Sequence, residues 1–220
     1  MGKTKDLIDN GDGTCTFRFK DDVTGENGVF DPGANKVELK IDGMGRASML
    51  LSQYFFPILR TAGIPTHDIS FDLENGTMTA HKLTIFPIEF IWRCKAMGSF
   101  CKRYGVEPGK ELPKIIESTL KDDGLGDPLI NKEAAVAIGL ITAEQYHICD
   151  ILTRRTGVVL QARLASFGYE LIDFKVEFGL NKDGGIMLGD EVSGGIWRIL
   201  KDGAKVDPID TAKTICPEHY

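Results

Sequence analysis

A segment near the C-terminus of this 220-residue chain, Leu171–Gly179, alternates between apolar and charged side chains. Successive side chains of an extended strand point to opposite faces, so the segment predicts a strand with two very different faces. The apolar face would carry Ile172, Phe174, Val176 and Phe178, and the other face Asp173, Lys175 and Glu177. Any fold of this chain must bury the first face and accommodate an acid, a base and an acid on the second.

The residues after this strand predict a hairpin, because Asn181–Gly185 has the composition of a hairpin loop. If Asp183-Gly184 is its two-residue tip, Glu177 lies directly opposite Asp190, with the two Cβ atoms roughly 4.5–5.5 Å apart. Two carboxylates this close repel unless a cation or a proton lies between them. Oxygen ligands suit Mg²⁺, which usually shares its shell with substrate phosphates, so the hairpin predicts a metal and phosphate site.

An exposed, salt-bridged hairpin is the alternative interpretation of the same residues. It explains the alternation, but not why Lys175 is flanked by two acids on a strand whose other face is wholly apolar. We therefore favour a site that includes this hairpin together with Ser193 and Arg198.

Composition excludes several classes of protein. The formal net charge of -6 and the lack of a basic run argue against a nucleic-acid-binding surface. The five cysteines form no C-x-x-C pair, which disfavours both a disulfide framework and a structural zinc site. The N-terminus has no apolar signal region, and no apolar run approaches the ~18–20 residues that span a bilayer. A cytoplasmic protein without a membrane partner is expected.

Strands and helices are segregated early in the chain and mixed later, which predicts an α+β fold. A change in composition near Phe86-Pro87 predicts a boundary between two lobes, residues 1–85 and 86–220. The expected strands cover 14–19, 37–41, 69–73 and 77–85, and the expected helices cover 45–62, 97–104, 132–139 and 142–168. Pro57 should kink or end the first helix, and Thr142 with Gln145 fits a capping box.

Two further groups of residues could bind anions. Lys3 and Lys5 would lie on one side of an extended strand, where both could contact a polyphosphate. Their spacing is not that of a Walker A motif. A solvated N-terminus is the commoner alternative for such residues. Ser99 is a plausible helix N-cap, and free N–H groups at helix N-termini bind phosphates. Arg93 with Lys102 and Arg103 could complete that pocket. A capped helix with basic surface residues is an equally open alternative.

Together, the order of these motifs resembles the SAICAR synthetase family, from Gly2 to about Asp202. The similar runs are Gly2–Lys5, Phe19–Asp21, Thr24, Asn27-Gly28, Ala62–His67, Pro87–Glu89 through Arg93 to Gly98-Ser99, Lys102–Gly105, Leu125–Asn131, Asp173–Gly179 and Gly189–Glu191. The resemblance implies an antiparallel-sheet ATP-binding lobe packed on a larger α+β lobe. It implies that ATP activates the carboxylate of carboxyaminoimidazole ribotide (CAIR) as an acyl phosphate, from which the amine of L-aspartate displaces phosphate.

The resemblance also implies residue roles. Lys3 and Lys5 would contact the phosphates of ATP, the connection from Lys82 to Glu89 would hold adenine, and Glu177 with Asp190 would bind Mg²⁺–ATP. Asp173, Lys175 and Arg198 would be the catalytic residues. The residues that bind the ribotide would be Arg93, Ser99, Lys102, Arg103 and Arg198.

The chain departs from the family pattern in several places. The family's Ser-Pro-Asp is here Ser193-Gly194-Gly195, its paired asparagines are replaced around Ser48-Met49, and residues 29–40 look like an insertion. Two alternatives therefore stay open: a related carboxylate–amine ligase with another amine, and a nucleotide-binding remnant without turnover. An enzyme of this size could also be a homo-oligomer.

Overall fold

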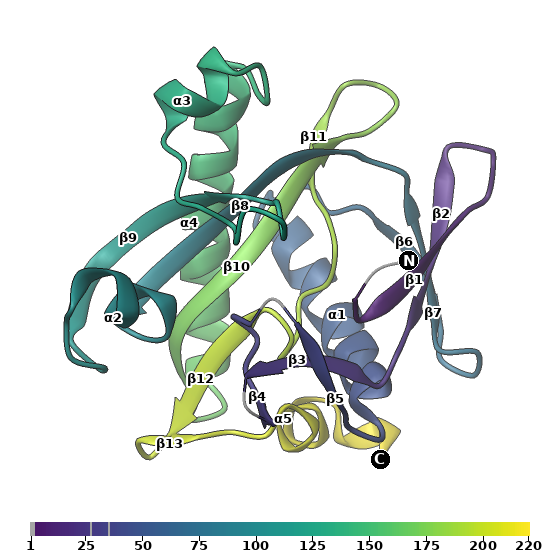
Figure 1. The fold of residues 1–220 in the computed structure, drawn as a ribbon. Coiled ribbons are helices and arrows are strands. Elements are labelled where there is room, and N and C mark those ends of the chain that lie inside the picture. The colour runs from purple at the N-terminus through teal and green to yellow at the C-terminus, as the bar shows by residue number, and fades with distance from the viewer. Residues whose placement is uncertain (1–2, 27, 35) are drawn as a thin grey trace.

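The computed structural model describes residues 3–26, 28–34 and 36–220. Gly2 of the first motif, Asn27 of the Asn27-Gly28 motif and Asn35 of the predicted insertion lie outside the described residues. The fold combines antiparallel sheets with helices, and the predicted α+β class is confirmed (Figure 1).

Three antiparallel sheets divide along the sequence. Two lie before Thr84: a four-stranded sheet in the order β1 (Lys5–Asp9), β2 (Thr14–Phe19), β7 (Thr77–His81), β6 (Asp68–Asp72), and a small sheet in the order β4 (Val29–Phe30), β3 (Asp22–Glu26), β5 (Val37–Lys40). The third follows the order β13 (Ala204–Lys205), β12 (Trp197–Lys201), β10 (Glu170–Leu180), β8 (Thr84–Lys95), β9 (Glu111–Leu120), with β11 (Ile186–Leu188) paired to β10.

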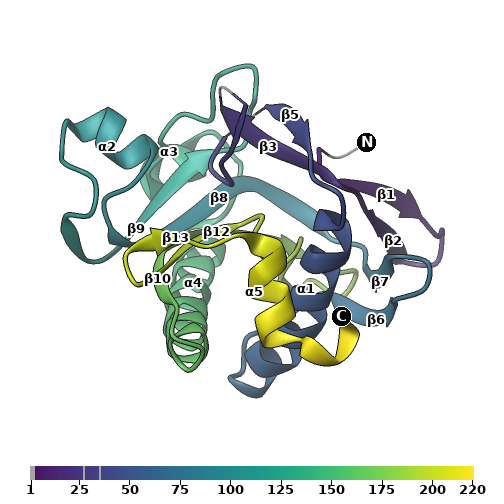
Figure 2. The ribbon, with the colours of Figure 1, turned by 90° about the horizontal axis from the view of Figure 1, so that it is seen from below.

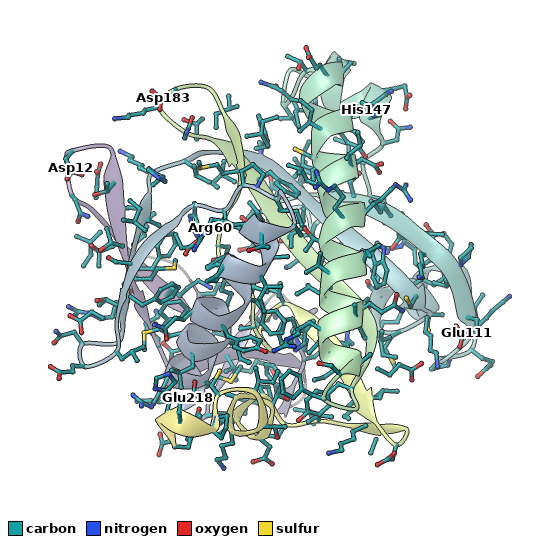
Figure 3. The ribbon with its side chains drawn as sticks, turned by 180° about the vertical axis from the view of Figure 1, so that it is seen from behind. Asp12, Arg60, Glu111, His147, Asp183 and Glu218 are labelled. Atoms are coloured by element: carbon teal, nitrogen blue, oxygen red, sulfur yellow. The ribbon has the colours of Figure 1, made fainter. Side chains whose placement is uncertain are left out.

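The helices pack mainly on one side of the long strands. They are α1 (Met44–Thr61), α2 (Ser99–Tyr104), α3 (Lys132–Ala137), α4 (Ala143–Ala165) and α5 (Pro208–Ile215), with a 3₁₀ turn at Pro217–His219. Figure 2 shows α1 and α4 on one side of β8 and β10, and β3 and β5 on the other. Seen from behind, α4 and α1 lie in front of these strands (Figure 3).

The core extends from α1 to the space between α4 and the apolar face of β8 and β10. Trp92 stacks on Phe174 with ring centroids 5.5 Å apart, and Phe90 meets Phe178 at 5.7 Å. Gly157 allows α4 to approach the sheet, because a Cβ at this position would lie 2.6 Å from the Trp92 ring. The predicted apolar face of the strand at 171–179 is therefore in the core.

Several local predictions are confirmed and others are wrong. Thr142 and Gln145 form the predicted capping box, with Thr142 Oγ1 accepting from the Gln145 backbone N–H. The helix predicted over 45–62 is confirmed as α1, which does not end at Pro57 but continues to Thr61. The strand predicted over 77–85 is two elements, β7 and β8, and β8 runs through Pro87. None of the described helices is long and apolar enough to cross a membrane.

Candidate active site

Strand β10 presents Asp173, Lys175 and Glu177 to the side opposite α4. The register places Asp173 beside Arg93 of β8 and Arg198 of β12, and Glu177 beside Glu89 of β8. A central strand with neighbours on both sides brings together residues from distant parts of the chain. The alternation seen in the sequence therefore builds a charged surface across three strands.

The predicted pairing of Glu177 with Asp190 across the hairpin is wrong by one residue. Phe178 pairs with Leu188, and Glu177 lies opposite Gly189, whose N–H donates to the Glu177 carbonyl. The loop is wider than a two-residue turn, because the Asn181 side chain accepts hydrogen bonds from the N–H groups of Asp183 and Gly185. The tip of this loop is marked by Asp183 in Figure 3.

Glu177 and Asp190 nevertheless belong to one cluster with two lysines, of which Lys5 is buried and Lys121 is exposed. Lys121 Nζ donates to both carboxylate oxygens of Glu177, at 2.5 and 2.6 Å. Lys5 Nζ lies 2.9 Å from Asp190 Oδ1 and also pairs with Glu191. We call Lys5, Lys121, Glu177, Asp190 and Glu191 the carboxylate–lysine cluster.

Charge and burial oppose each other in this cluster. Burial, followed by the nearby carboxylate of Asp190, raises the pKa of Glu177. Burial also disfavours the ionised form of Asp190, but Lys5 outweighs it and the pKa of Asp190 is lowered. Burial likewise opposes the ammonium of Lys5, and Asp190 and Glu191 outweigh it, so the pKa of Lys5 is raised. The cluster thus gathers more negative charge than its two lysines balance.

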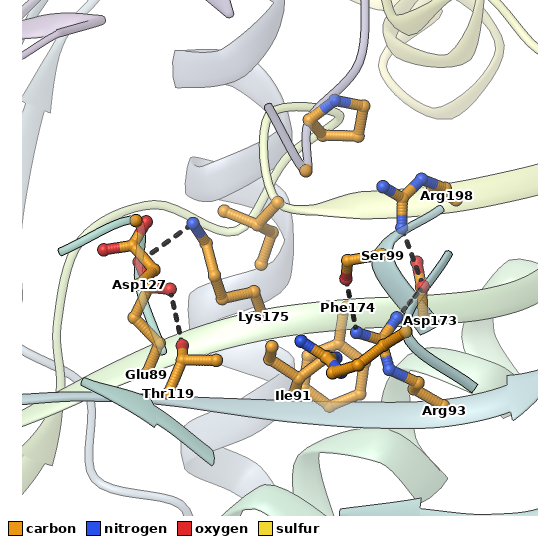
Figure 4. A pocket seen from close by; sticks show the side chains of 15 residues that line it. Glu89, Ile91, Arg93, Ser99, Thr119, Asp127, Asp173, Phe174, Lys175 and Arg198 are labelled. Carbon is orange, nitrogen blue, oxygen red and sulfur yellow. Dashed lines mark hydrogen bonds and ion pairs between the residues drawn. The ribbon is translucent and has the colours of Figure 1, made fainter. Parts of the chain in front are cut away.

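The second part of the site is a cavity beside Asp173 (Figure 4). Asp173 Oδ2 accepts from Arg93 Nη1 at 2.7 Å and from Arg198 Nη1 at 2.8 Å. Arg93 also donates to Ser99 Oγ at 3.3 Å. Arg103 and Lys175 line the same cavity, so six of the residues predicted for the ribotide or for catalysis meet there. We call this the arginine cavity.

A loop from the first half of the chain covers part of the arginine cavity. Arg198 Nη2 donates to Asp31 Oδ1 at 2.8 Å, and Pro32 and Gly33 line the cavity. The guanidinium lies so close to two backbones that a Cβ at Gly33 or Gly98 would be 2.1 or 2.7 Å from Nη2. Gly98 also has a φ of +55°, a conformation that favours glycine.

Glu89 connects the two parts of the site. Its carboxylate lies 2.9 Å from Lys175 Nζ and accepts from Thr119 Oγ1 at 3.0 Å, and it is next to Glu177 across the β8–β10 pair. Lys175 and Glu89 therefore stand between the arginine cavity and the carboxylate–lysine cluster, and Figure 4 shows them at one end of the cavity.

Other predicted residues lie elsewhere or have other local roles. Lys3 pairs with Asp123 at 2.6 Å, on the exposed polar loop that follows Lys121. Lys82 is exposed and pairs with Asp9 at 2.5 Å, and Lys102 lies on the exposed side of α2. Ser99 does not cap α2: Gly98 is the N-cap, and Ser99 is the first helical residue.

Sequence reasoning missed Lys121, Asp31, Glu117 and Glu191 as members of the site. Glu117 accepts from Arg93 Nε at 2.7 Å. Each of these residues stands in a segment remote from its partner, so spacing along the chain carries no signal for the pairing. The position of Lys121 at the start of an acceptor-rich loop is the one local hint.

Comparison with known proteins identifies the family. The family model described as SAICAR synthetase matches residues 1–212 of the chain. The chain belongs to the SAICAR synthetase family. The resemblance seen in the order of the sequence motifs is therefore confirmed.

Individual relatives cover nearly the whole chain. The phosphoribosylaminoimidazole-succinocarboxamide synthase of Clostridium tetani is 45% identical over 219 residues, which are 97% of this chain and 96% of that protein. The same enzyme of Methanocaldococcus jannaschii is 37% identical over 87% of this chain and 76% of that protein. Among solved structures, a SAICAR synthetase in complex with ADP has a TM-score of 0.87 and 30% identity over 99% of this chain and 97% of that chain. The enzyme of Pyrococcus horikoshii has a TM-score of 0.83 and 31% identity, over 96% and 95%.

The departures from the SAICAR synthetase pattern lie close together. Ser193 Oγ donates to the Glu191 carboxylate and lies 3.3 Å from Ser48 Oγ. A Cβ at Gly194 would lie 2.5 Å from Cβ of Pro208, and a Cβ at Gly195 would lie 3.1 Å from Glu191 Oε1. Ser48, Ser193 and Gly194-Gly195 are thus parts of one packing arrangement, in which Pro208 of α5 approaches the loop after Asp190.

The carboxylate–lysine cluster fits a bound Mg²⁺. Glu177, which is buried, and Asp190, which is partly exposed, supply hard oxygen ligands. A cation would relieve the repulsion between them, which, after burial, raises the pKa of Glu177. Among the described residues no group of three or more His, Cys, Asp or Glu side chains converges as a metal site. Mg²⁺ at Glu177 and Asp190 would therefore need further ligands from water or phosphate, which is its usual habit.

Proposed function

We propose that the two parts of the site divide the substrates of one ligation between them. As a SAICAR synthetase, the chain is an ATP-dependent ligase of purine biosynthesis that joins L-aspartate to the carboxylate of CAIR and yields SAICAR, ADP and phosphate. The carboxylate–lysine cluster would receive the phosphates of ATP, and the arginine cavity would receive the ribotide. The observation that carries this division is that β10 contributes Glu177 to the first and Asp173 to the second.

The residue roles follow from charge and position. Lys5, buried beside Asp190, would contact the phosphates of ATP, with Lys3 at the entrance and Lys82 with Glu89 on the connection expected to hold adenine. Glu177 and Asp190 would hold Mg²⁺, which neutralises the charge that builds up on the transferred phosphoryl group. In the arginine cavity, Arg93, Ser99 and Arg198 would bind the ribotide, with Lys102 and Arg103 on α2 near its anionic groups.

Lys175 is placed to act at the junction. The γ-phosphoryl group of ATP passes to the CAIR carboxylate, the bond to ADP breaks, and an acyl phosphate forms. The aspartate amine then attacks the acyl carbon and phosphate leaves. Lys175, 2.9 Å from Glu89, could approach the carboxylate as it is phosphorylated, while Asp173 and Arg198 hold the ribotide in place. Holding both reactants in one geometry supplies much of the rate enhancement in such transfers.

The test is an ADP-release assay with a panel of amines. Purified protein with Mg²⁺, ATP and CAIR is expected to release ADP with L-aspartate and little with other amino acids. ADP release with a different amine would favour the related ligase, a possibility raised by Gly194-Gly195 in place of Pro-Asp. If no amine gives phosphate release in a single turnover, the result would instead favour the other alternative, a nucleotide-binding remnant without turnover.

Three coarser proposals accompany this function. We propose that residues 1–85 and 86–220 form two lobes, since the sheets divide at Thr84. We also propose a cytoplasmic protein with no nucleic-acid partner and a homo-oligomeric assembly, which light scattering tests.

A further inference from the structure

His67 is buried beside the proposed metal site. It is 2% exposed, and it follows the turn that ends α1. Its ring meets the edges or faces of two aromatic rings, with centroids 5.2 Å from Phe17 and 5.8 Å from Phe56. These contacts fix the plane of the imidazole. A histidine that only fills space in a core would need these ring contacts and no further hydrogen bonds.

The segment that carries His67 is also attached to the strand that leads to Asp190. The N–H of Leu188 donates to the carbonyl of Pro65 at 2.8 Å, and the N–H of His67 donates to the carbonyl of Leu188 at 3.1 Å. Thr66 and Leu188 form a parallel bridge. The imidazole is therefore held at a fixed place relative to the end of β11, two residues before Asp190.

One ring nitrogen of His67 reaches the backbone of Asp190. His67 Nε2 lies 2.8 Å from the Asp190 carbonyl oxygen. A carbonyl oxygen can only accept a hydrogen bond, so Nε2 must carry the hydrogen. The acceptor residue has a φ of +64°, a left-handed conformation that is uncommon outside glycine, although aspartate adopts it more readily than most residues. The hydrogen bond from His67 is thus made to a residue with an uncommon backbone conformation, which the bond can help to hold.

The conformation of Asp190 determines where its carboxylate points. Its Oδ1 lies 2.9 Å from Lys5 Nζ, and its charge is felt by Glu177. We propose that His67 is a positioning residue: its Nε2–H holds the Asp190 carbonyl and so keeps the Asp190 carboxylate beside Lys5, where it can share a cation with Glu177. This inference rests on the proposed assignment of Glu177 and Asp190 to Mg²⁺, and it adds a residue that touches neither metal nor substrate.

Two substitutions of His67 distinguish a role as hydrogen-bond donor from a role in packing alone. His67→Phe keeps an aromatic ring between Phe17 and Phe56 but removes the donor, whereas His67→Gln retains a side-chain N–H near the position of Nε2. His147→Phe, at an exposed position on α4, is the matched control. Outer-shell partners of metal ligands typically change metal affinity about 10–100-fold when mutated.

The primary readout is ADP binding by calorimetry with and without Mg²⁺, which requires no turnover. His67→Phe is expected to lose about 10-fold or more of the Mg²⁺ affinity of the ADP complex. His67→Gln should recover most of that loss, and His147→Phe should match the parent protein. Wild-type Mg²⁺ affinity in a folded His67→Phe protein, or equal losses in both His67 variants, would overturn the proposal.

A measurement on the unaltered protein keeps the proposal testable if His67→Phe does not fold. The ¹⁵N chemical shifts of the His67 ring should show hydrogen on Nε2 and none on Nδ1. The opposite tautomer would overturn the proposal. Failure of the metal assignment itself is distinguishable, because Glu177→Gln would then leave the Mg²⁺ dependence of ADP binding unchanged.

Discussion

Lys121 Nζ lies within hydrogen-bonding distance of both carboxylate oxygens of Glu177, at 2.5 and 2.6 Å. The Glu177 side chain is 11% exposed and the Lys121 side chain 47%, so the ammonium approaches a buried acid from the solvent side. It stands beside the carboxylate to which we assign Mg²⁺. A lysine from the end of β9 thus compensates a charge on β10 that a metal ion could compensate instead.

Lys121→Met should therefore destabilise the ligand-free protein more than the Mg²⁺–ADP complex. Removing one partner of a fully buried pair costs about 3–5 kcal/mol, and the exposure of Lys121 reduces our expectation to about 1–2 kcal/mol. Thermal unfolding checks this. The gain in Tm on adding Mg²⁺ and ADP should be larger in the variant than in the parent, since ligands that bind only the folded state stabilise it. An unchanged Tm of the ligand-free variant would contradict the prediction.

Glu177→Gln should abolish Mg²⁺-dependent turnover and leave the fold intact. The amide keeps the shape of the side chain but removes the negative charge that attracts the cation. We expect at least about a 100-fold loss of kcat/KM, equivalent to ~2.7 kcal/mol. Circular dichroism checks the fold, and Glu144→Gln, exposed at the start of α4, is the control. Near-normal turnover would remove Glu177 from the metal site.

Asp31→Asn should lower the KM for CAIR. Burial opposes ionisation of Asp31, but Arg198 outweighs it and lowers the pKa of Asp31, so this carboxylate is charged at neutral pH. Of the two carboxylates on Arg198, Asp31 is the more exposed, with 30% of its side chain accessible against 4% for Asp173. It is therefore the one that an anionic substrate group can displace.

The expected change in KM is about two- to fivefold, since such partly exposed pairs contribute about 0.2–1 kcal/mol. The asparagine retains the hydrogen bond from the Gly33 N–H, so the loop should keep its turn. Steady-state kinetics with CAIR varied at saturating ATP and aspartate measure the effect. A higher KM would mean that Asp31 orients Arg198 rather than competing for it.

Gly194→Ala should destabilise the protein by about 1–3 kcal/mol, the usual cost of overpacking. The added methyl group would lie 2.5 Å from Cβ of Pro208, so α5 would have to move away from the loop after Asp190. Chemical denaturation measures the change. Gly124→Ala is the control, because its Cβ would meet only Asp122 Oδ1, the end of a flexible side chain, at 3.2 Å. Equal stabilities of the two variants would show that α5 moves at little cost.

The sequence predicted the parts of this site that depend on local pattern. The alternation over 171–179 located β10, because strand faces repeat every two residues and need no distant information. The register of the hairpin was missed by one residue, since it depends on how Asn181 hydrogen-bonds within its own loop. Lys121 was missed because its pairing with Glu177 depends on β9, β8 and β10 lying side by side.

His67 shows a different limit of sequence reasoning. A single histidine without metal-ligand spacing is usually a structural residue. Its contact with Asp190 arises because α1 delivers the segment at 65–67 to β11, a relationship of tertiary structure. The signal for a role of His67 beside Asp190 comes from its surroundings in the fold.

The burial of His67 predicts a pH dependence of stability. Burial lowers the pKa of His67 and outweighs the raising effects of the Asp190 carbonyl and of the Asp190 and Asp68 carboxylates. Because the folded-state pKa is below the unfolded value of about 6.5, the unfolded chain binds more protons between the two values. The contribution of His67 to stability is therefore fully present above pH 6.5 and is lost as the pH falls through 6.5 toward the folded-state pKa.

Urea unfolding of the parent protein and of His67→Gln at pH 7.5, 6.5 and 5.5 isolates this contribution, because all other titrating groups are common to both. The parent should lose stability on acidification faster than the variant, by at most about 1.4 kcal/mol per pH unit, the limit for one proton. Glutamine does not titrate, so it cannot reproduce the effect even where it replaces the hydrogen bond to Asp190. Parallel pH profiles for the two proteins would mean that His67 takes up a proton as readily in the folded state as in the unfolded chain.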